Sequence, residues 1–163
     1  MTRWLDADEQ RAWRAFLGAV QLLQTQLDRE LQRDSGIPHA YYEILARLSE
    51  APDRVLRMSE LAQASESSRS RLSHAVARLE EAGWVNRESC PTDRRGSFAR
   101  LTDAGWAALE AAAPLHVESV RRHLIDRLTP EQLRQLLDIS EAILDGLRPD
   151  IGHPACSETP RAG

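Results

Sequence analysis

The 163-residue sequence predicts a mainly α-helical fold with one small β-hairpin. Over most of the chain, apolar residues recur every three or four positions, which is the period of helices with one buried face. Between Trp84 and Leu101 the period falls to two on both sides of the turn sequence DRRG, which indicates two antiparallel strands. Directly before this hairpin, two short helical segments are separated by only two residues, and such a pair predicts a helix-turn-helix.

Capping and breaking residues set the expected ends of the helices. Asp6 or Asp8 can cap the first helix, and Ser59 can cap the third. Gly83 ends the fourth helix, and Pro114 predicts a kink in the fifth. The expected helices cover residues 6–33, 38–49, 59–64, 67–82, 102–128 and 130–147, and the hairpin covers residues 84–101.

Length and composition favour one functional unit of ordinary globular type. No apolar stretch reaches the roughly 18 to 20 residues of a membrane span, and the N-terminus carries no export signal, so we expect a cytoplasmic protein with no membrane association. Cys90 and Cys156 lie far apart and predict neither a disulfide nor a metal site, and no cofactor is expected. We expect residues 1–148 to form a single domain and residues 149–163, rich in Pro, Gly and Ser, to be a disordered tail.

Positive charge is concentrated in the middle third of the chain. The whole sequence has a net charge of −4. Between Arg54 and Arg100, however, nine arginines face six acidic residues, whereas the remainder holds 12 arginines and 19 acidic residues. Because a nucleic-acid site is defined by local charge and not by the total, this region is the candidate site.

The expected helix over residues 67–82 has a polar and basic face opposite its apolar stripe of Leu72, Val76 and Leu79. An α-helix fits the major groove of DNA, where arginine can bind guanine edges and serine hydroxyls can hold phosphates. The alternative is a solvated helix face that happens to be rich in Ser and Arg. The candidate DNA-binding residues on this helix are Ser68, Arg69, Ser70, Arg71, Ser73, His74 and Arg78, with Arg78 expected to hold a phosphate.

The tip of the expected hairpin carries two adjacent arginines beside one carboxylate. A narrow minor groove concentrates negative potential and attracts arginine, so Arg94 and Arg95 could enter or flank it. Asp93 could hold the Arg95 guanidinium in a fixed orientation before DNA arrives. Arg87, at the start of the hairpin, completes the candidate set. The alternative is an ordinary charged turn.

These residues resemble the MarR family of winged helix-turn-helix transcriptional regulators. Members of that family carry a wing signature of the form DxRxxxVxLT followed shortly by Gly, and only Ala99 departs from it, where Val is usual. The stretch from Leu79 to Val85 is similar to the family's junction between the recognition helix and the wing. The resemblance covers roughly residues 7–147, and the signature positions are Asp93, Arg95, Leu101, Thr102 and Gly105.

The resemblance implies a bacterial homodimer that binds double-stranded DNA at a pseudo-palindromic operator and represses transcription. It implies a winged helix-turn-helix lobe over residues 38–101 and dimerisation helices over residues 7–36 and 102–147. The sequence supports the dimer independently, because the apolar stripes of the long helices are more than one small lobe can cover.

Family members commonly release DNA when a small, often phenolic, effector binds. Trp13, His39, Tyr41 and Tyr42 are the residues we expect around such a ligand, since they combine apolar walls with polar tips; for each, an ordinary core or interface position is the alternative. A thiol-based redox response through Cys90 is a second hypothesis for regulation.

Two other functional classes are alternatives to a DNA-binding regulator. The sequence has no GxSxG, no HExxH and no glycine-rich phosphate loop, so an enzyme is not expected. A winged-helix module that binds protein and not DNA is the remaining alternative, but it would not need an arginine-bearing helix together with a DxR wing.

Overall fold

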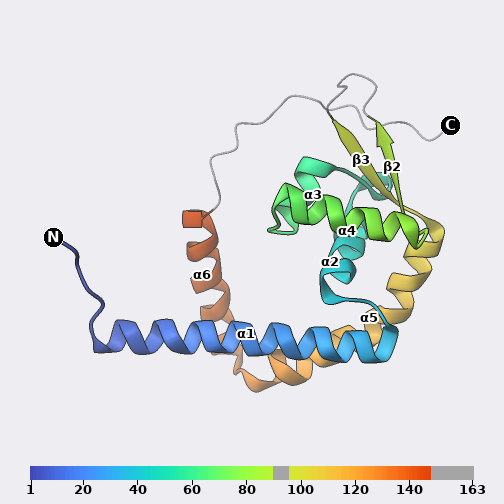
Figure 1. Cartoon of the computed structure of the whole chain (residues 1–163). Helices are drawn as coiled ribbons and strands as arrows, with labels where there is room; N and C mark the ends of the chain where they lie inside the picture. Colours follow the sequence, from blue (N-terminus) through green and yellow to red (C-terminus); the bar gives the residue numbers. More distant parts are fainter. Residues whose placement is uncertain (90–95, 148–163) are drawn as a thin grey trace. The chain divides into compact units, whose positions relative to one another are not determined.

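The computed structural model describes residues 1–89 and 96–147 as six α-helices and three β-strands (Figure 1). The prediction of a mainly helical chain with a small hairpin is confirmed. The helices are α1 (Ala7–Ser35), α2 (His39–Glu50), α3 (Met58–Ala64), α4 (Arg69–Glu81), α5 (Asp103–His123) and α6 (Pro130–Leu147). The strands are β1 (Val55–Arg57), β2 (Val85–Ser89) and β3 (Ser97–Leu101), and short 3-10 turns span Pro52–Arg54 and Ile125–Arg127.

The chain divides into two compact units, Met1–Val120 and the part from Arg121 onward. The first unit holds helices α1 to α4, the sheet and nearly all of α5. The second unit contains α6 and the 3-10 turn before it.

The long first helix begins where the sequence predicts. The Asp6 side chain accepts hydrogen bonds from the backbone N–H groups of Asp8 and Glu9, both at 2.8 Å, and Glu9 accepts one from the Asp6 N–H at 2.9 Å. This reciprocal pair is a capping box, which satisfies N–H groups that the first helical turn leaves without partners. At the other end, Gly36 adopts a left-handed conformation with φ of 71°, which residues other than glycine adopt only at a cost.

The structure departs from the predicted elements in three details. Ser59 is not the cap of α3, because that helix begins at Met58 and the Glu60 carboxylate accepts the backbone N–H of Arg57 at 3.0 Å. The fifth helix runs through Pro114 but ends at His123, not at residue 128. The hairpin is also not alone, because β1 adds a third strand.

The sheet has the order β1-β3-β2, and both pairs are antiparallel. Ala99 of β3 is the partner of Leu56 on one side and of Arg87 on the other. Since β1 has only three residues, its sequence is too short to display an alternating pattern. The central position of β3 explains why Ala99 is fully buried: its side chain packs in the core of the lobe.

The core of the first unit lies between α2, α3 and α4 and extends to the sheet and α5. Leu45, Leu48, Leu61 and Leu79 are completely buried in it. Side chains of this size each contribute about 1.5 to 3 kcal/mol when they are removed from water. This packing fixes α4 on one side and leaves its opposite side exposed.

The start of α5 is joined to the end of α4 by a close contact. Thr102 donates its hydroxyl to the Gly83 carbonyl at 2.7 Å and accepts the Gly105 N–H at 3.0 Å, and its own N–H donates to the Trp84 carbonyl at 3.0 Å. A Cβ atom on Gly105 would lie 2.2 Å from the Trp84 carbonyl oxygen. Only glycine therefore fits at position 105.

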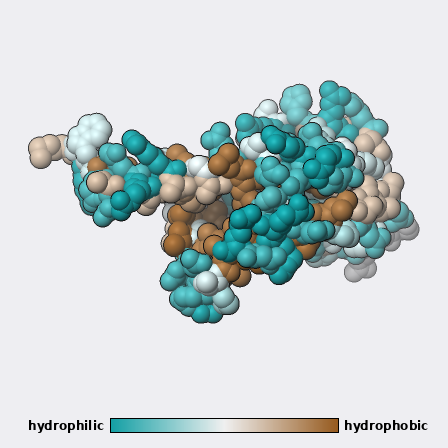
Figure 2. Space-filling view, turned by 90° about the horizontal axis from the view of Figure 1, so that it is seen from below, coloured by the Kyte–Doolittle hydropathy of each residue, from teal (hydrophilic) through white to brown (hydrophobic). Residues whose placement is uncertain are grey.

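Several long apolar side chains remain exposed on the helices outside this core. On α1, Trp13 is 52% exposed, and on α6 Leu137 is 56% exposed. Figure 2 shows apolar side chains exposed among hydrophilic ones on the face seen from below.

Among the described residues, no helix combines the length and apolar content needed to cross a membrane.

Replacing Gly105 by alanine tests the close contact at the start of α5. We expect Gly105→Ala to lower the free energy of unfolding by about 2 to 3 kcal/mol, because the new methyl group meets a backbone carbonyl that cannot rotate away. Urea unfolding followed by circular dichroism measures the change. The matched control is Gly18→Ala on α1, where nothing lies within 4 Å of the added Cβ. The control should be neutral or stabilising by up to about 1 kcal/mol, and an equal loss in both variants would contradict the steric explanation.

Candidate nucleic-acid interface

The candidate interface is built on α4, which follows α3 after a tight turn. In this turn, Ser67 donates its backbone N–H to the Ala62 carbonyl at 2.9 Å, and Glu66 has a positive φ of 47°. Ser68 is the N-cap of α4, and its hydroxyl accepts the Arg71 N–H at 3.3 Å. The serine predicted to contact DNA therefore also fixes the first turn of the helix.

The predicted DNA-binding residues of α4 occupy three strips of its surface. Successive residues turn by about 100° around a helix, so Ser70 and His74 lie opposite the buried Leu72 and Val76. Both are exposed. The two flanks of this central strip are formed by Arg69 and Ser73 on one side and by Arg71 and Arg78 on the other.

Each flank of α4 borders a hollow. The larger hollow has a volume of about 730 Å³ and includes Arg71, His74 and Arg78 from α4 together with His39 and Tyr41 from α2. It is open to solvent and lies wholly within the first unit. It therefore brings two of the four residues predicted around a ligand next to the candidate DNA-binding helix.

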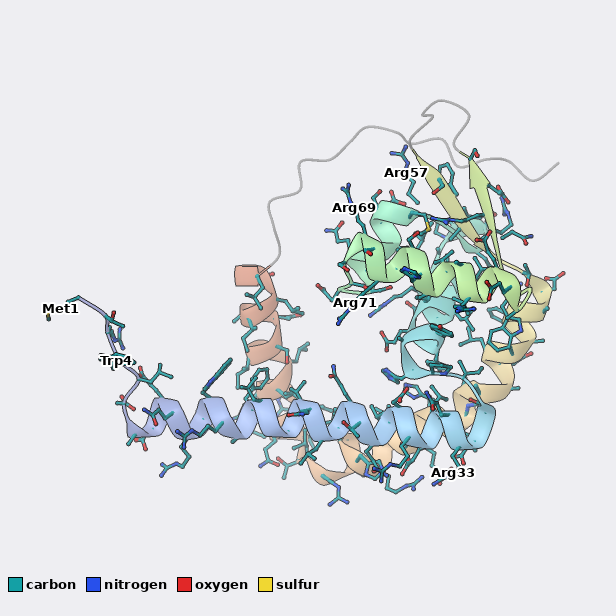
Figure 3. All side chains as sticks on the ribbon, in the orientation of Figure 1. Met1, Trp4, Arg33, Arg57, Arg69 and Arg71 are labelled. Carbon is teal, nitrogen blue, oxygen red and sulfur yellow. The ribbon has the colours of Figure 1, made fainter. Side chains whose placement is uncertain are left out.

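The smaller hollow, which we call the basic cleft, lies on the other flank. It has a volume of about 420 Å³. In Figure 3, Arg69 and Arg71 both lie at the N-terminal end of α4, Arg69 on the same side of the helix as Arg57 and Arg71 on the opposite side. The polar residues that line the cleft are Arg57, Ser59, Arg69, Ser73, Arg87 and Ser97.

Arg87 connects the wing to α4. Its Nη2 atom donates to the Ser73 hydroxyl at 3.2 Å, and its backbone N–H donates to a carboxylate oxygen of Glu80 at 3.0 Å. Across the hairpin, Arg100 donates to Glu88 at 2.6 Å, and this carboxylate raises the pKa of Arg100 above its usual value. These contacts hold the base of the wing at one position relative to α4.

Arg78 is engaged within its own helix. Its Nη1 atom lies 2.8 Å from a carboxylate oxygen of Glu81, and this hydrogen bond raises the pKa of Arg78. Both side chains are exposed, so such a pair is worth little and can be exchanged for a phosphate.

The remaining wing predictions lie outside the described residues. These predictions concern Asp93, Arg94, Arg95 and Cys90. Outside the wing, Cys156 and the expected tail over residues 149–163 also lie beyond the described residues.

The other two residues predicted around a ligand have different surroundings. Tyr42 is buried, and its ring lies 4.4 Å from that of His116 on α5. Burial, together with His39, lowers the pKa of His116. Trp13 is exposed on α1 and does not line the larger hollow. The sequence did not single out His116, because a lone histidine in a helix carries no recognisable pattern.

No metal site is present among the described residues: no three His, Cys, Asp or Glu side chains come together in a way that could hold a metal ion. The polar side chains that line the basic cleft are guanidinium groups and hydroxyls, which can donate hydrogen bonds to an anion.

The geometry of this lobe is shared with a DNA-bound protein. The chain is 54% identical in sequence to Sco3205, a MarR family transcriptional regulator from Streptomyces coelicolor whose crystal structure was determined in complex with DNA. The similarity covers 92% of this chain and 94% of that one, with a TM-score of 0.88. This chain belongs to the MarR family. In agreement, residues 35–96 match the profile described as MarR family.

Two further MarR-family relatives support the same assignment. AbsC from Streptomyces coelicolor is 48% identical, with 90% of this chain and 98% of that one covered and a TM-score of 0.83. The transcriptional regulator HosA from Escherichia coli is 26% identical over 132 residues, which span 81% of this chain and 96% of HosA. The chain is thus a MarR-family transcriptional regulator with a winged helix-turn-helix fold. The relatives named here are transcriptional regulators, which supports a regulatory and not an enzymatic role.

The double role of Ser68 in this MarR-family protein can be tested by comparing two substitutions. Ser68→Ala removes the cap and should lower the free energy of unfolding by about 1 kcal/mol. Ser68→Asp keeps a capping oxygen, so its free energy of unfolding should stay within a few tenths of a kcal/mol of the wild-type value. In DNA affinity the order of the two variants reverses, because the carboxylate introduced by Ser68→Asp would face the phosphates of the duplex. We expect Ser68→Asp to bind a DNA duplex more weakly than Ser68→Ala in fluorescence anisotropy. Tighter binding by the aspartate variant would contradict a DNA-facing position for residue 68.

Proposed function

We propose that this chain is a homodimeric repressor that binds a pseudo-palindromic operator and is released from it by a small, for instance phenolic, ligand. The observation that carries the proposal is the exposed polar and basic surface of α4, held in place by a fully buried opposite side. It is supported by the 54% identity to a regulator whose crystal structure contains DNA.

In this proposal α4 is the recognition helix and enters the major groove. The central strip of Ser70 and His74 would face the base edges, where short hydrogen-bonding side chains allow close approach. Arg69 and Arg71, one on each flank, would reach guanine edges or the phosphates that border the groove. Ser68, Ser73 and Arg78 complete this part of the interface.

The wing would contact the neighbouring minor groove. Arg87 lies at its base and is held against α4. Asp93, Arg94 and Arg95 are assigned to its tip from the sequence alone. We expect Arg95 to enter or flank the groove and Asp93 to orient it, as their match to the family signature implies.

The exposed apolar side chains of α1 and α6 support a homodimer. An amphipathic helix normally buries its apolar stripe, and a second copy of the chain offers a matching surface under two-fold symmetry. Two α4 helices related in this way would read half-sites about one DNA turn apart, near 34 to 36 Å. The proposed dimerisation segments are residues 7–36 and 102–147, which flank the lobe over residues 38–101.

The larger hollow is where we place the ligand. His39 and Tyr41 provide hydrogen-bonding tips on one wall, and Arg71 and Arg78 offer positive charge on the other. Glu43 and Glu66 also line the hollow, so the negative group of a small phenolic anion would lie on the side of the arginines. Because the hollow shares Arg71 with the proposed DNA-binding surface, an occupied hollow would withdraw that arginine from DNA.

DNA binding is tested with the purified chain on the DNA that flanks its own gene. We expect preference over a random duplex and a steep loss of affinity as salt rises, because phosphate contacts release counterions. Arg71→Ala should weaken binding by about 1 to 3 kcal/mol in fluorescence anisotropy. The matched control is Arg47→Ala on α2, which removes the same charge at an exposed position that lines neither hollow and should change affinity little. Equal DNA affinity of Arg71→Ala and the wild type would contradict this role for Arg71 and would favour the alternative of a protein-binding module.

The dimer is tested by placing a charge on the apolar face of α6. Leu137→Asp should convert the chain to a monomer in light scattering coupled to gel filtration, since a carboxylate cannot be buried without a partner. Glu141→Gln on the same helix is the control and should remain dimeric. A Leu137→Asp variant with the mass of a dimer would exclude this part of α6 from the interface.

A further inference from the structure

We propose that the basic cleft is a seat for one backbone phosphate of DNA and that Arg57, which lies outside both the recognition helix and the wing, is part of it. The inference rests on the proposed DNA binding and adds to it a residue and a defined site. Its chemistry is the binding of an oxyanion by three guanidinium groups.

Three separate elements bring their arginines to this cleft. Arg57 lies at the junction of β1 and α3, Arg69 is the first residue of α4, and Arg87 comes from β2. Within the described part of the chain, none of the residues that line the cleft is acidic, and three serines add hydroxyl donors. Guanidinium groups from three elements around one cleft can share a single oxyanion through charge-assisted hydrogen bonds.

The Arg57 side chain is held in place. Its Cζ atom lies 5.9 Å from the centre of the Phe98 ring, and its Nε atom is buried. Its backbone is fixed on one side by pairing with Phe98 of β3 and on the other by the N–H bond to Glu60. A guanidinium group that is already ordered loses little conformational entropy when it binds a phosphate.

The second wall of the cleft is equally ordered. Arg87 donates to the Ser73 hydroxyl, so the strand and the recognition helix meet at this point. A phosphate held by Arg57, Arg69 and Arg87 would therefore contact β1, α4 and the wing at the same time. Such a contact would fix the register of the protein on the duplex without reading any base.

The lining of the cleft favours DNA over a free effector. Sites for small organic ligands are mostly apolar, whereas Met58 and Leu72 are the large apolar residues among those that line this cleft. Ser59, Arg69 and Arg87 are exposed, so a phosphate attached to a duplex can reach the cleft from outside. The cleft also borders the strip of α4 that is proposed to enter the major groove.

The proposal is tested by the salt dependence of binding to a random-sequence duplex of about two helical turns, which needs no knowledge of the operator. Removing one phosphate contact should reduce the slope of log K against log salt by about 0.9. We expect this reduction for Arg57→Ala. The matched control is Arg47→Ala, an exposed arginine of α2 that pairs with Glu50 at 3.7 Å and does not line the cleft. Its slope should equal that of the wild type.

A second variant protects the test against a folding defect in Arg57→Ala. Ser59→Asp adds a carboxylate to the exposed rim of the cleft and should weaken DNA binding at least tenfold at low salt while the melting temperature stays unchanged. Arg57→Lys keeps the positive charge but loses the planar guanidinium group that can bind a phosphate with two hydrogen bonds. Its DNA affinity should lie between those of the wild type and Arg57→Ala.

The outcomes separate the possible occupants. A lower slope for Arg57→Ala with a normal slope for Arg47→Ala supports the phosphate seat. Equal slopes for wild type and Arg57→Ala, with Ser59→Asp binding normally, would overturn it. If slopes are equal but calorimetry shows that Arg57→Ala alone has lost binding of inorganic phosphate, the cleft holds a free anion and the DNA assignment is wrong. A wild-type chain that binds no duplex at any salt would instead refute the proposed function itself.

Discussion

The winged lobe depends on one steric constraint, the passage of α5 beneath the end of α4 at Gly105. The Trp84 carbonyl occupies the space that a side chain at this position would need, and Thr102 joins the two segments through its hydroxyl. Because Thr102 directly follows β3, the same contact sets where the wing leaves the lobe. In its Leu-Thr and Gly positions, the family signature packs the wing and α5 against the end of α4, and these positions do not need to contact DNA.

The sequence predicted the elements that have long periodic patterns and strong local signals. The helical periods located α1, α2, α4 and α6 within a few residues, and the capping role of Asp6 is visible in the bonds it makes. Prediction failed where the pattern is short or the decisive contact is distant. The three residues of β1 are defined only by pairing with β3, and Ser59 lost the capping position because Glu60 bonds back to Arg57.

The candidate site shows the same division. A helical wheel separates the polar from the apolar side of α4, so its serines and arginines could be named from the sequence. What the pattern could not reveal is that these residues border two different hollows, since each hollow is completed by elements far away in the chain: α2 for one, β1 and β2 for the other. Arg57 was missed for this reason. It is one arginine among nine in the middle third, and only the fold brings it beside Arg69 and Arg87.

The bonds of Arg87 to both Ser73 and Glu80 have a consequence for selectivity. They join the base of the wing to α4 and so limit how far one can move relative to the other. If α4 enters a major groove and the wing the adjacent minor groove, as proposed, this connection sets the distance between the two contacts. Sequences whose stiffness or groove width departs from that distance would have to deform, at an energetic cost that depends on base pairs the protein never touches. Part of the operator preference would then be encoded in the mechanics of DNA and not in hydrogen bonds to bases.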